Sequence, residues 1–276
     1  QTETITDSEV ALARCADLFA DDPIGCNMVA ASVRPPDPVE LIRASADGST
    51  VGTAVRWGDG YTLSSCRDIG LQAIADALPI DRSFELVGPT GPAADVAGRW
   101  TQRCDGAARP VEMMRVYRLG TLRAPADTAG QLVEASDDHL DLGAEWSVAF
   151  VTEIGHDPPS LDAARTQLGR TAAQGRLFTW LVGGKPRAQL LTAVARFGVA
   201  RIGGVYTPPS ERGRGYAAAM TAAASAVHLA RPDVDTVTLN TQAANAATNR
   251  LYRRLGFEPH HESLTIDLIP SETVAV

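Results

Sequence analysis

The sequence has little of what marks several large classes of protein. Lys185 is the only lysine among 25 basic residues, so Schiff-base chemistry has a single candidate and nearly every cation is a permanently charged guanidinium. No apolar run approaches the roughly 18 residues that span a bilayer. The N-terminal segment is polar and charged and lacks the order of a signal peptide. We expect a soluble, cytoplasmic protein without a membrane partner.

Cysteine is scarce, and its spacing excludes the common metal sites. The four cysteines lie within the first 104 residues, form no C-x-x-C pair and have no histidine at ligand spacing nearby. We interpret them as buried, reduced thiols. The sequence therefore predicts no metal centre.

A basic surplus is also lacking. The formal net charge of −8 argues against nucleic acid as a partner, since proteins that grip a polyanion usually carry excess positive charge. At 276 residues and 45% hydrophobic, the chain can bury a substantial core, and a length of roughly 100 to 200 residues per domain favours two domains. We place the boundary near residue 121, which gives domains 1–121 and 122–276.

The first of these domains alternates helical and extended patterns, which predicts helices that cover a sheet. The predicted helices are 7–21, 67–78 and 93–103, and the predicted strands are 51–57, 84–87 and 111–119. In the second domain, helices at 137–154 and 161–173 precede an antiparallel meander. Its strands are 177–182, 188–195 and 200–207, and a helix at 214–229, a strand at 236–240, a helix around residue 252 and a strand at 263–268 follow.

The most informative segment runs from Val205 to Ala218, where a strand leads into a basic, glycine-rich turn that opens a helix. Backbone amides in the first turn of a helix lack internal partners and lie at the positive end of the helix dipole. Gly213 and Gly215 let a ligand approach the backbone, and the neighbouring arginines add charge. This segment predicts a pyrophosphate site.

Two other phosphate motifs fit less well. A Walker-type nucleotide loop is excluded because no Gly-Lys-Ser or Gly-Lys-Thr sequence is present. The residues Gly213, Gly215 and Ala218 also match the spacing of a Rossmann fingerprint, with Asp233 and Asp235 about twenty residues on. However, residues 208–211 intervene between the strand and the glycine-rich turn, and roughly sixty residues remain afterwards, too few for the second half of a doubly wound sheet.

Two motifs together resemble the GNAT acyltransferase superfamily. Arg212, Gly215 and Ala217 match R-x-x-G-x-A, and residues 245–257 match N-x-x-x-N-x-L-Y-x-x-x-G-F. The likeness covers about residues 123–276, and the first half resembles a degenerate copy without the R-x-x-G-x-A motif. The resemblance implies an α/β (α+β) fold of tandem GNAT-like domains, each a mixed, mostly antiparallel sheet flanked by helices.

The resemblance also implies a site for acetyl-CoA, or another acyl-CoA, as co-substrate. Its pantetheine arm would follow the strand that ends near Val205, and an amide there would stabilise the oxyanion of acyl transfer. Asn245 would contact the arm, whereas Asn249 can equally well bond neighbouring backbone. The implied cofactor-binding residues are Val205, Tyr206, Thr207, Arg212, Gly213, Arg214, Gly215, Tyr216, Ala217, Ala218, Asn245 and Asn249.

Tyr252 occupies the position from which family members protonate the departing thiolate, although an aromatic residue on this helix can also be core. An attacking amine arrives as an ammonium, so a base is required near the acceptor. We select Glu153, at the end of the 137–154 helix, with Glu145, Asp141 and His156 as alternatives.

The implied activity is acetyl transfer from acetyl-CoA to the amine of a small molecule by direct attack. Protein N-termini are a weaker possibility, and transfer of a larger acyl group or a non-catalytic sensor of acyl-CoA are the alternatives. A peptidyl transferase that uses aminoacyl-tRNA is disfavoured by the acidic charge balance. Gln242 and Ala246 depart from similar sequences, which carry an acid and a proline there. We expect a monomer or a homodimer.

Overall fold

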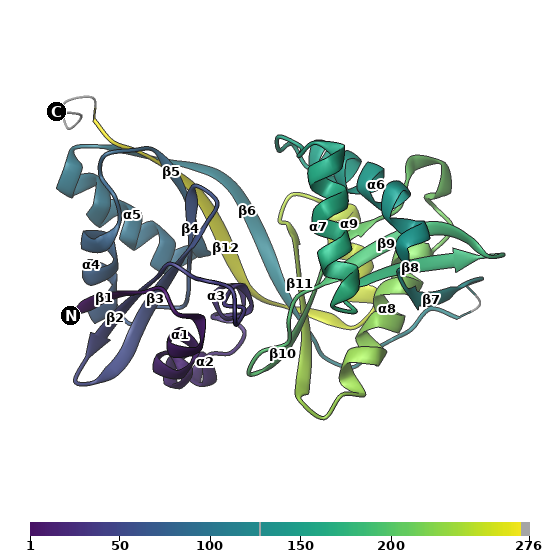
Figure 1. The fold of residues 1–276 in the computed structure, drawn as a ribbon, viewed down its shortest axis with the longest axis horizontal. Helices are drawn as coiled ribbons and strands as arrows, with labels where there is room; N and C mark the ends of the chain where they lie inside the picture. Colours follow the sequence, from purple (N-terminus) through teal and green to yellow (C-terminus); the bar gives the residue numbers. More distant parts are fainter. Residues whose placement is uncertain (127, 272–276) are drawn as a thin grey trace.

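The computed structural model describes residues 1–126 and 128–271. Within this part of the chain, the strands form one continuous sheet in the order β1-β2-β3-β4-β5-β12-β6-β11-β10-β9-β8-β7. Figure 1 shows two lobes that are joined by the long strands β6 (Ala107–Leu119) and β12 (Phe257–Ile269), drawn in teal and yellow. The two lobes therefore share a backbone hydrogen-bond ladder.

The two halves of the chain repeat one order of elements. The first half runs β1 (Thr2–Ile5), α1 (Ser8–Arg14), α2 (Ala16–Asp21), α3 (Asn27–Ser32), β2 (Leu41–Ala46), β3 (Ser49–Trp57), β4 (Gly60–Leu63), α4 (Asp68–Ala77), β5 (Phe84–Pro89), α5 (Thr90–Cys104) and β6. The second half runs β7 (Gln131–Glu134), η1 (Asp137–His139), α6 (Leu140–Glu153), α7 (Leu161–Ala173), β8 (Leu177–Val182), β9 (Lys185–Thr192), β10 (Gly198–Tyr206), η2 (Pro209–Glu211), α8 (Tyr216–Leu229), β11 (Val234–Gln242), α9 (Ala246–Arg254) and β12.

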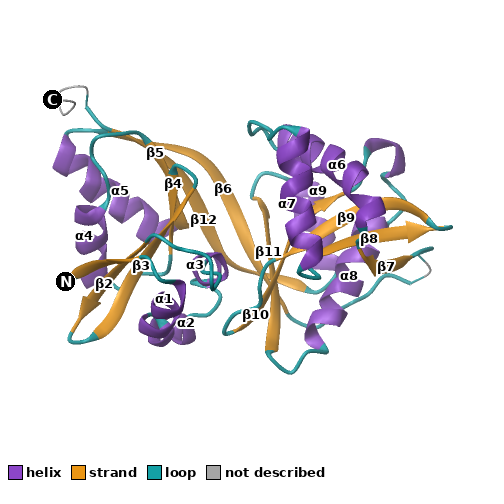
Figure 2. Cartoon of the chain, viewed as in Figure 1, coloured by secondary structure: helices purple, strands orange, loops and turns teal. Residues whose placement is uncertain are grey.

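The pairing of strands follows the same repeat. In the first half β4 pairs in parallel with β5, in the second β10 pairs in parallel with β11, and the other described pairs are antiparallel. A helix, α4 or α8, makes each parallel crossover, and Figure 2 shows helices flanking the sheet in both lobes. The mixed, mostly antiparallel tandem fold predicted from the sequence is confirmed.

The last strand of each half is exchanged with the other half. Strand β6 lies between β12 and β11, and β12 lies between β5 and β6. Residues 263–268 of β12 pair with residues 84–89 of β5, and residues 114–118 of β6 pair with residues 238–242 of β11. The boundary near residue 121 stays a prediction, and strands cross it in both directions.

The exchange is buried in two hydrophobic cores. Leu264, Ile266 and Leu268 of β12 belong to the core of the first half, which includes the fully buried Trp100. Tyr117 of β6 belongs to the core of the second half, with residues of α8 and α9. Since burial of a large apolar side chain contributes roughly 1.5–3 kcal/mol, each half stabilises the other.

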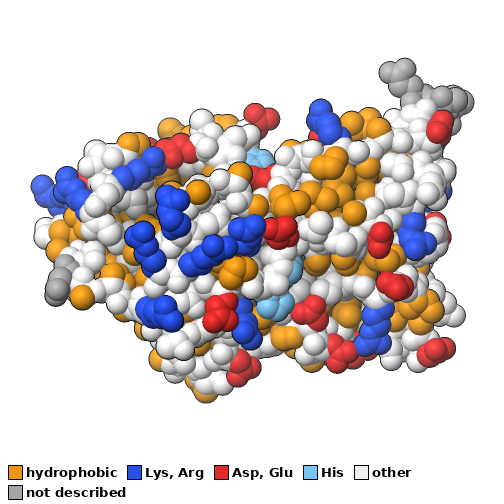
Figure 3. Space-filling model, turned by 180° about the vertical axis from the view of Figure 1, so that it is seen from behind, with side chains coloured by type: hydrophobic (Ala, Val, Ile, Leu, Met, Phe, Trp, Pro, Cys, Tyr) orange, Lys and Arg blue, Asp and Glu red, His pale blue; other side chains and the backbone are white. Residues whose placement is uncertain are grey.

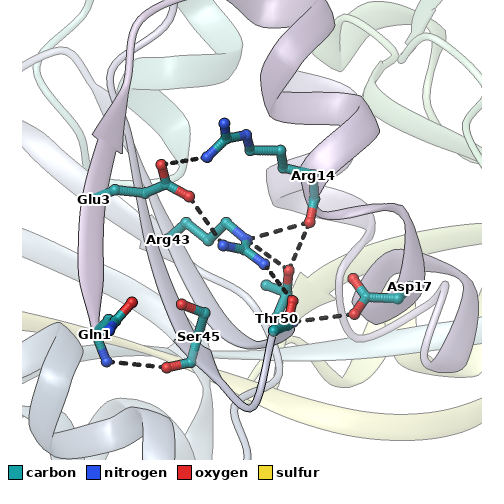
Figure 4. Close-up of polar contacts among 8 residues, drawn as sticks. Gln1, Glu3, Arg14, Asp17, Arg43, Ser45 and Thr50 are labelled. Carbon is teal, nitrogen blue, oxygen red and sulfur yellow. Dashed lines mark hydrogen bonds and ion pairs between the residues drawn. The ribbon is translucent and has the colours of Figure 1, made fainter.

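Polar contacts fasten the N-terminal strand to its neighbours (Figure 4). The buried guanidinium of Arg43 on β2 donates to Glu3 Oε1 at 2.9 Å and to Thr50 Oγ1 at 2.8 Å. Glu3 also accepts from Arg14 at 2.7 Å, which joins β1 to α1. These contacts link the short elements β1, α1 and β2, and join them to β3.

The structure bears on two sequence predictions for this half and on one for the whole described chain. The single helix predicted at 7–21 is two helices, because the backbone leaves helical geometry at Cys15 (φ −104°, ψ 4°). The four cysteines are free thiols, three of them buried. Among the described residues, no helix is both long and apolar enough to cross a membrane.

The back of the molecule carries both signs of charge. In Figure 3, Lys and Arg side chains gather near the middle, with acidic side chains among and below them. Apolar side chains gather over part of the half drawn at right, which is the first half in this view.

Candidate functional site

Strands β10 and β11 separate toward their C-terminal ends. Their parallel pairing stops at Ile202 and Leu239, although β10 continues to Tyr206 and β11 to Gln242. A bulge between Gly203 and Tyr206, where Gly204 has φ +56°, turns the end of β10 while it stays paired with β9. The ends of two parallel strands therefore open like a wedge.

A cavity of about 560 Å³ occupies this opening. Such a volume lies in the usual range for small-molecule sites. Most of the cofactor-binding residues predicted from the sequence meet here, although they come from separate segments. The lining residues are Phe150, Glu153, Ile154, Val205, Tyr206, Thr207, Glu211, Arg212, Gly213, Gly215, Tyr216, Ala217, Ala218, Gln242, Asn245, Ala247, Thr248 and Leu251.

The start of α8 points backbone donors at this cavity. Gly215 is the N-cap, and no side chain caps the helix. Gly213 and Gly215 have φ of +78° and +82°, a conformation that glycine adopts at little cost. The amides of residues 213–215 donate to no acceptor in the described part of the chain. The helix start thus combines free donors with a positive dipole end, the combination that holds phosphate.

Arg212 and Glu153, predicted to bind phosphate and to act as base, contact each other. Their ion pair has an N–O distance of 2.6 Å. Arg212 also donates to the carbonyl of Thr207 at 2.9 Å and lies over the ring of Tyr206. The Tyr206 hydroxyl donates to Glu153 at 3.2 Å. Burial, and then the charge of Glu153, raises the pKa of Tyr206.

The side chain of Arg214, predicted to bind the cofactor, points to a neighbouring carboxylate. Its side chain is 56% exposed, pairs with Glu211 at 3.3 Å and is not among the lining groups of the cavity. Arg187 on β9 forms a second ion pair with Glu211. Only the backbone of Arg214 is therefore available to a ligand in the cavity, because its guanidinium group is paired with Glu211.

The two asparagines of the second motif have different surroundings. Asn245 lines the cavity and caps α9, accepting from the Thr248 amide at 3.2 Å. Asn249 is 6% exposed and does not line the cavity, and its predicted cofactor contact stays a prediction. Its amide donates to the carbonyls of residues 242, 243 and 245, and its oxygen accepts from Tyr117 at 2.6 Å. These bonds leave no atom for a ligand.

Tyr252 is not among the lining residues of the cavity. It is 7% exposed and packs against Tyr117 and Phe257. Thr248 lies one turn earlier on the same helix face and does line the cavity. Because helical side chains lean toward the N-terminus of their helix, the side chain of Tyr252 leans toward Thr248. Burial raises the pKa of Tyr252 to about 12, and its hydroxyl has no hydrogen-bond partner among the described residues. Whether it serves as the acid stays a prediction.

The first half contacts a lining residue of the cavity, which the sequence did not reveal. Glu112 of β6 accepts from the Gln242 side chain at 2.6 Å and lies 3.6 Å from His156. Only strand exchange brings Glu112 here. Asp141 and Glu145, the carboxylates predicted as alternative bases, are exposed and do not line the cavity. Asp141 pairs with Arg165.

The corresponding place in the first half is filled. A cavity of only about 20 Å³ lies there, with Leu63 of β4 and Gly88 of β5 among its lining residues. The turn before α4 has no glycine, and Ser65 in it donates to Asp22 at 2.5 Å. Of the two repeats, the second therefore holds the open site. In the described residues, no group of three or more His, Cys, Asp or Glu could hold a metal ion.

Comparisons with known proteins agree with this division. Residues 142–257 match the model of the Acetyltransferase (GNAT) family. A search of curated proteins finds no match. A GNAT-family acetyltransferase from Colwellia psychrerythraea superposes with a TM-score of 0.62 at 14% identity, covering 98% of this chain and 100% of that one.

Two further solved structures share the fold. A tandem GNAT protein from the clavulanic acid biosynthesis pathway has a TM-score of 0.60 at 16% identity, with 98% of each chain covered. A GCN5-related N-acetyltransferase from Sphaerobacter thermophilus has a TM-score of 0.58 at 17% identity, covering 98% of this chain and 96% of that one. The chain thus has the tandem form of the fold and contains, at residues 142–257, a domain that matches the Acetyltransferase (GNAT) family model.

Proposed function

We propose that this protein transfers an acetyl group from acetyl-CoA to the amine of a small molecule in the cavity between β10 and β11. One observation carries the proposal: uncapped amides at the start of α8 and the open ends of two parallel strands border a single cavity. An elongated molecule with a diphosphate at one end and a thioester at the other matches both features.

The residues present fit this co-substrate. The amides of residues 213–218 and the guanidinium of Arg212 would hold the diphosphate. The backbone of Val205, Tyr206 and Thr207 would follow the pantetheine arm, and the buried Thr207 hydroxyl has no partner among the described residues. Arg212 cannot serve a phosphate fully while it pairs with Glu153, so binding of the diphosphate would weaken that pair.

In the proposed reaction the amine nitrogen attacks the thioester carbonyl carbon, a C–N bond forms and the C–S bond breaks. The proton lost by the ammonium passes to a carboxylate or an imidazole. We assign this role to Glu153, which lines the cavity, with the Glu112–His156 pair beside Gln242 as the alternative. Tyr252 would return a proton to the thiolate. The raised pKa keeps its phenol protonated at neutral pH, and the same dry surroundings would raise the pKa of the thiol.

Thiol release from acetyl-CoA over a panel of small amines tests the activity. With an amine that is turned over, Tyr252→Phe should lower kcat by about 10²-fold or more while CoA affinity is unchanged, because general acid catalysis contributes about 10²–10⁴-fold. Tyr61→Phe, in the first half, is the matched control and should change neither value. Full turnover by Tyr252→Phe would refute the assignment of the acid, and CoA binding without turnover of any amine would favour a sensor.

A further inference from the structure

A second cavity, of about 400 Å³, lies between the two halves at the other end of β10. The helix α8 extends from the first cavity, at Gly215, to the second, at His228. Its 14 residues separate the two by about 20 Å. The lining residues are Arg34, Pro35, Pro36, Asp37, Gln174, Gly175, Arg176, Thr192, Ala193, Val194, Ala195, Arg196, His228 and Arg231.

The cavity has an excess of positive charge. Arg34, Arg176 and Arg196 form no ion pair with any described carboxylate. Arg231 is neutralised by Asp233 at 2.7 Å. The only carboxylate among the described lining residues is Asp37, which is exposed. Three guanidinium groups against one carboxylate leave about two uncompensated positive charges.

These guanidinium groups are held in place by backbone oxygens and not by counter-charges. Arg34 donates to the Ala31 carbonyl at 3.3 Å, Arg176 to the Thr192 carbonyl at 2.8 Å, and Arg196 to the Val33 carbonyl at 3.4 Å. Arg176 also donates to the Gln174 side chain. Each of the three keeps further N–H groups uncommitted. Arg196 reaches from the second half to the first, so the arrangement depends on both.

Buried polar atoms without partners surround the same cavity. They are Nε of Arg196, the hydroxyl of Thr192 and both ring nitrogens of His228, whose side chain is 4% exposed. Arg201, on β10, carries another unpartnered Nε and a charge that acts on Arg34, but it lines the small cavity of about 20 Å³ and not this one. Burial, and then the charge of Arg34, lowers the pKa of both Arg176 and Arg201. Unpaired like charges at partly buried positions are costly in the absence of a counter-ion.

We propose that this cavity binds a small molecule that carries a phosphate group, and that residues of both halves contact the phosphate. A phosphate monoester brings close to two negative charges, which matches the excess, whereas a single carboxylate brings one. Guanidinium groups bind phosphate in a bidentate manner, which favours arginine at such a site. The cavity has the size of a small-molecule site. Its position, far from the acyl-transfer cavity, makes it a separate site.

Calorimetric titration with inorganic phosphate at pH 8, at ionic strength matched with chloride, tests the proposal. CoA is added to saturation so that the amides at the start of α8 are occupied. The intact protein should bind about one phosphate per chain, and citrate should bind more weakly. Tighter binding of citrate, or no binding of phosphate, would overturn the proposal.

Variants locate the anion. Arg176→Gln and Arg196→Gln should each weaken phosphate binding at least ten-fold, and Arg34→Gln tests the contribution of the first half. Arg165→Gln is the matched control, because this arginine is exposed and pairs with Asp141 elsewhere on the surface. Thermal unfolding without phosphate checks folding, and loss of an unpaired charge should not lower Tm. Phosphate binding that survives in all three cavity variants would place the anion elsewhere and refute the site.

Discussion

At the scale of single residues, the acyl-transfer cavity contains charges that already neutralise one another. Arg212 pairs with Glu153, and Arg187 and Arg214 pair with Glu211. An anionic ligand therefore meets a carboxylate that competes for the same guanidinium. The competition is modest in energy, since partly exposed ion pairs contribute about 0.2–1 kcal/mol.

We predict that Glu153→Gln tightens CoA binding while it lowers turnover. Removal of the competing carboxylate frees Arg212 for the diphosphate, and a gain of about 0.2–1 kcal/mol corresponds to roughly 1.4- to 5-fold in Kd. Calorimetry with CoA measures the change. Glu145→Gln, an exposed residue of the same helix outside the cavity, should leave Kd unchanged. Weaker CoA binding by Glu153→Gln would contradict the competition.

His228 gives a prediction for pH. Burial lowers the pKa of this histidine below its ordinary value of 6.5, and the charge of Arg231 acts in the same direction against an opposing effect of Asp233. The unfolded chain therefore binds a proton more readily, so stability is present above pH 6.5 and is lost as pH falls below it. Urea unfolding at about pH 7.5 and at about pH 5 should show that the free energy of unfolding falls less between these pH values for His228→Gln than for the intact protein. An equal loss would show that other groups cause it.

At the scale of elements, two short irregularities shape the cavity: the glycine turn before α8 and the bulge of β10. Gly204 in the bulge has φ +56°, and an added Cβ would lie 2.3 Å from Cδ1 of Leu191. Gly203, next to it, has open space where a Cβ would lie, and its backbone conformation is one that any residue adopts. The neighbouring glycines form a matched pair.

We predict that Gly204→Ala costs about 1–3 kcal/mol of stability and weakens CoA binding, because the left-handed backbone and the contact with Leu191 both oppose a side chain. Gly203→Ala should change the free energy of unfolding by much less. Urea unfolding and CoA titration of the two variants provide the comparison. Equal effects of the two substitutions would mean that the bulge does not hold the strands apart.

At the scale of the whole molecule, strand exchange makes the halves interdependent. The order β5-β12-β6-β11 places one strand from each half inside the sheet of the other. Glu112 contacts Gln242, which lines the cavity, only because β6 crosses over. The first half is thus part of the candidate site, although its own cavity is closed.

We predict that residues 122–276 expressed alone do not bind CoA. Without β6, both β11 and β12 lose their shared neighbour, and the apolar cover from Tyr117 is lost as well. Addition of residues 1–121 should restore CoA binding, as measured by calorimetry of the mixture. A monomeric fragment 122–276 that unfolds cooperatively and binds CoA would contradict this interdependence.

The residues that line the cavity were largely predictable because local chemistry marks them. A glycine-rich helix start and a short helix with an Asn cap have signals within a few residues. One question has no local signal: the sequence does not tell whether Asn249 and Tyr252 point into a cavity or into a core, since both lie on the same short helix. Strands β1, β2, β4 and β7 were missed because each is short and gains its stability from its neighbours.

The sequence by itself determined the resemblance to the GNAT superfamily, the order of the main elements in the second half and the glycine-rich helix start, because these depend on residues that are near neighbours along the chain. Tertiary structure alone decided the exchange of β6 and β12, the approach of Glu112 to Gln242 and the arginine-lined cavity between the halves. These features join residues that are far apart along the chain, and no spacing rule in the sequence records which distant strands will pair.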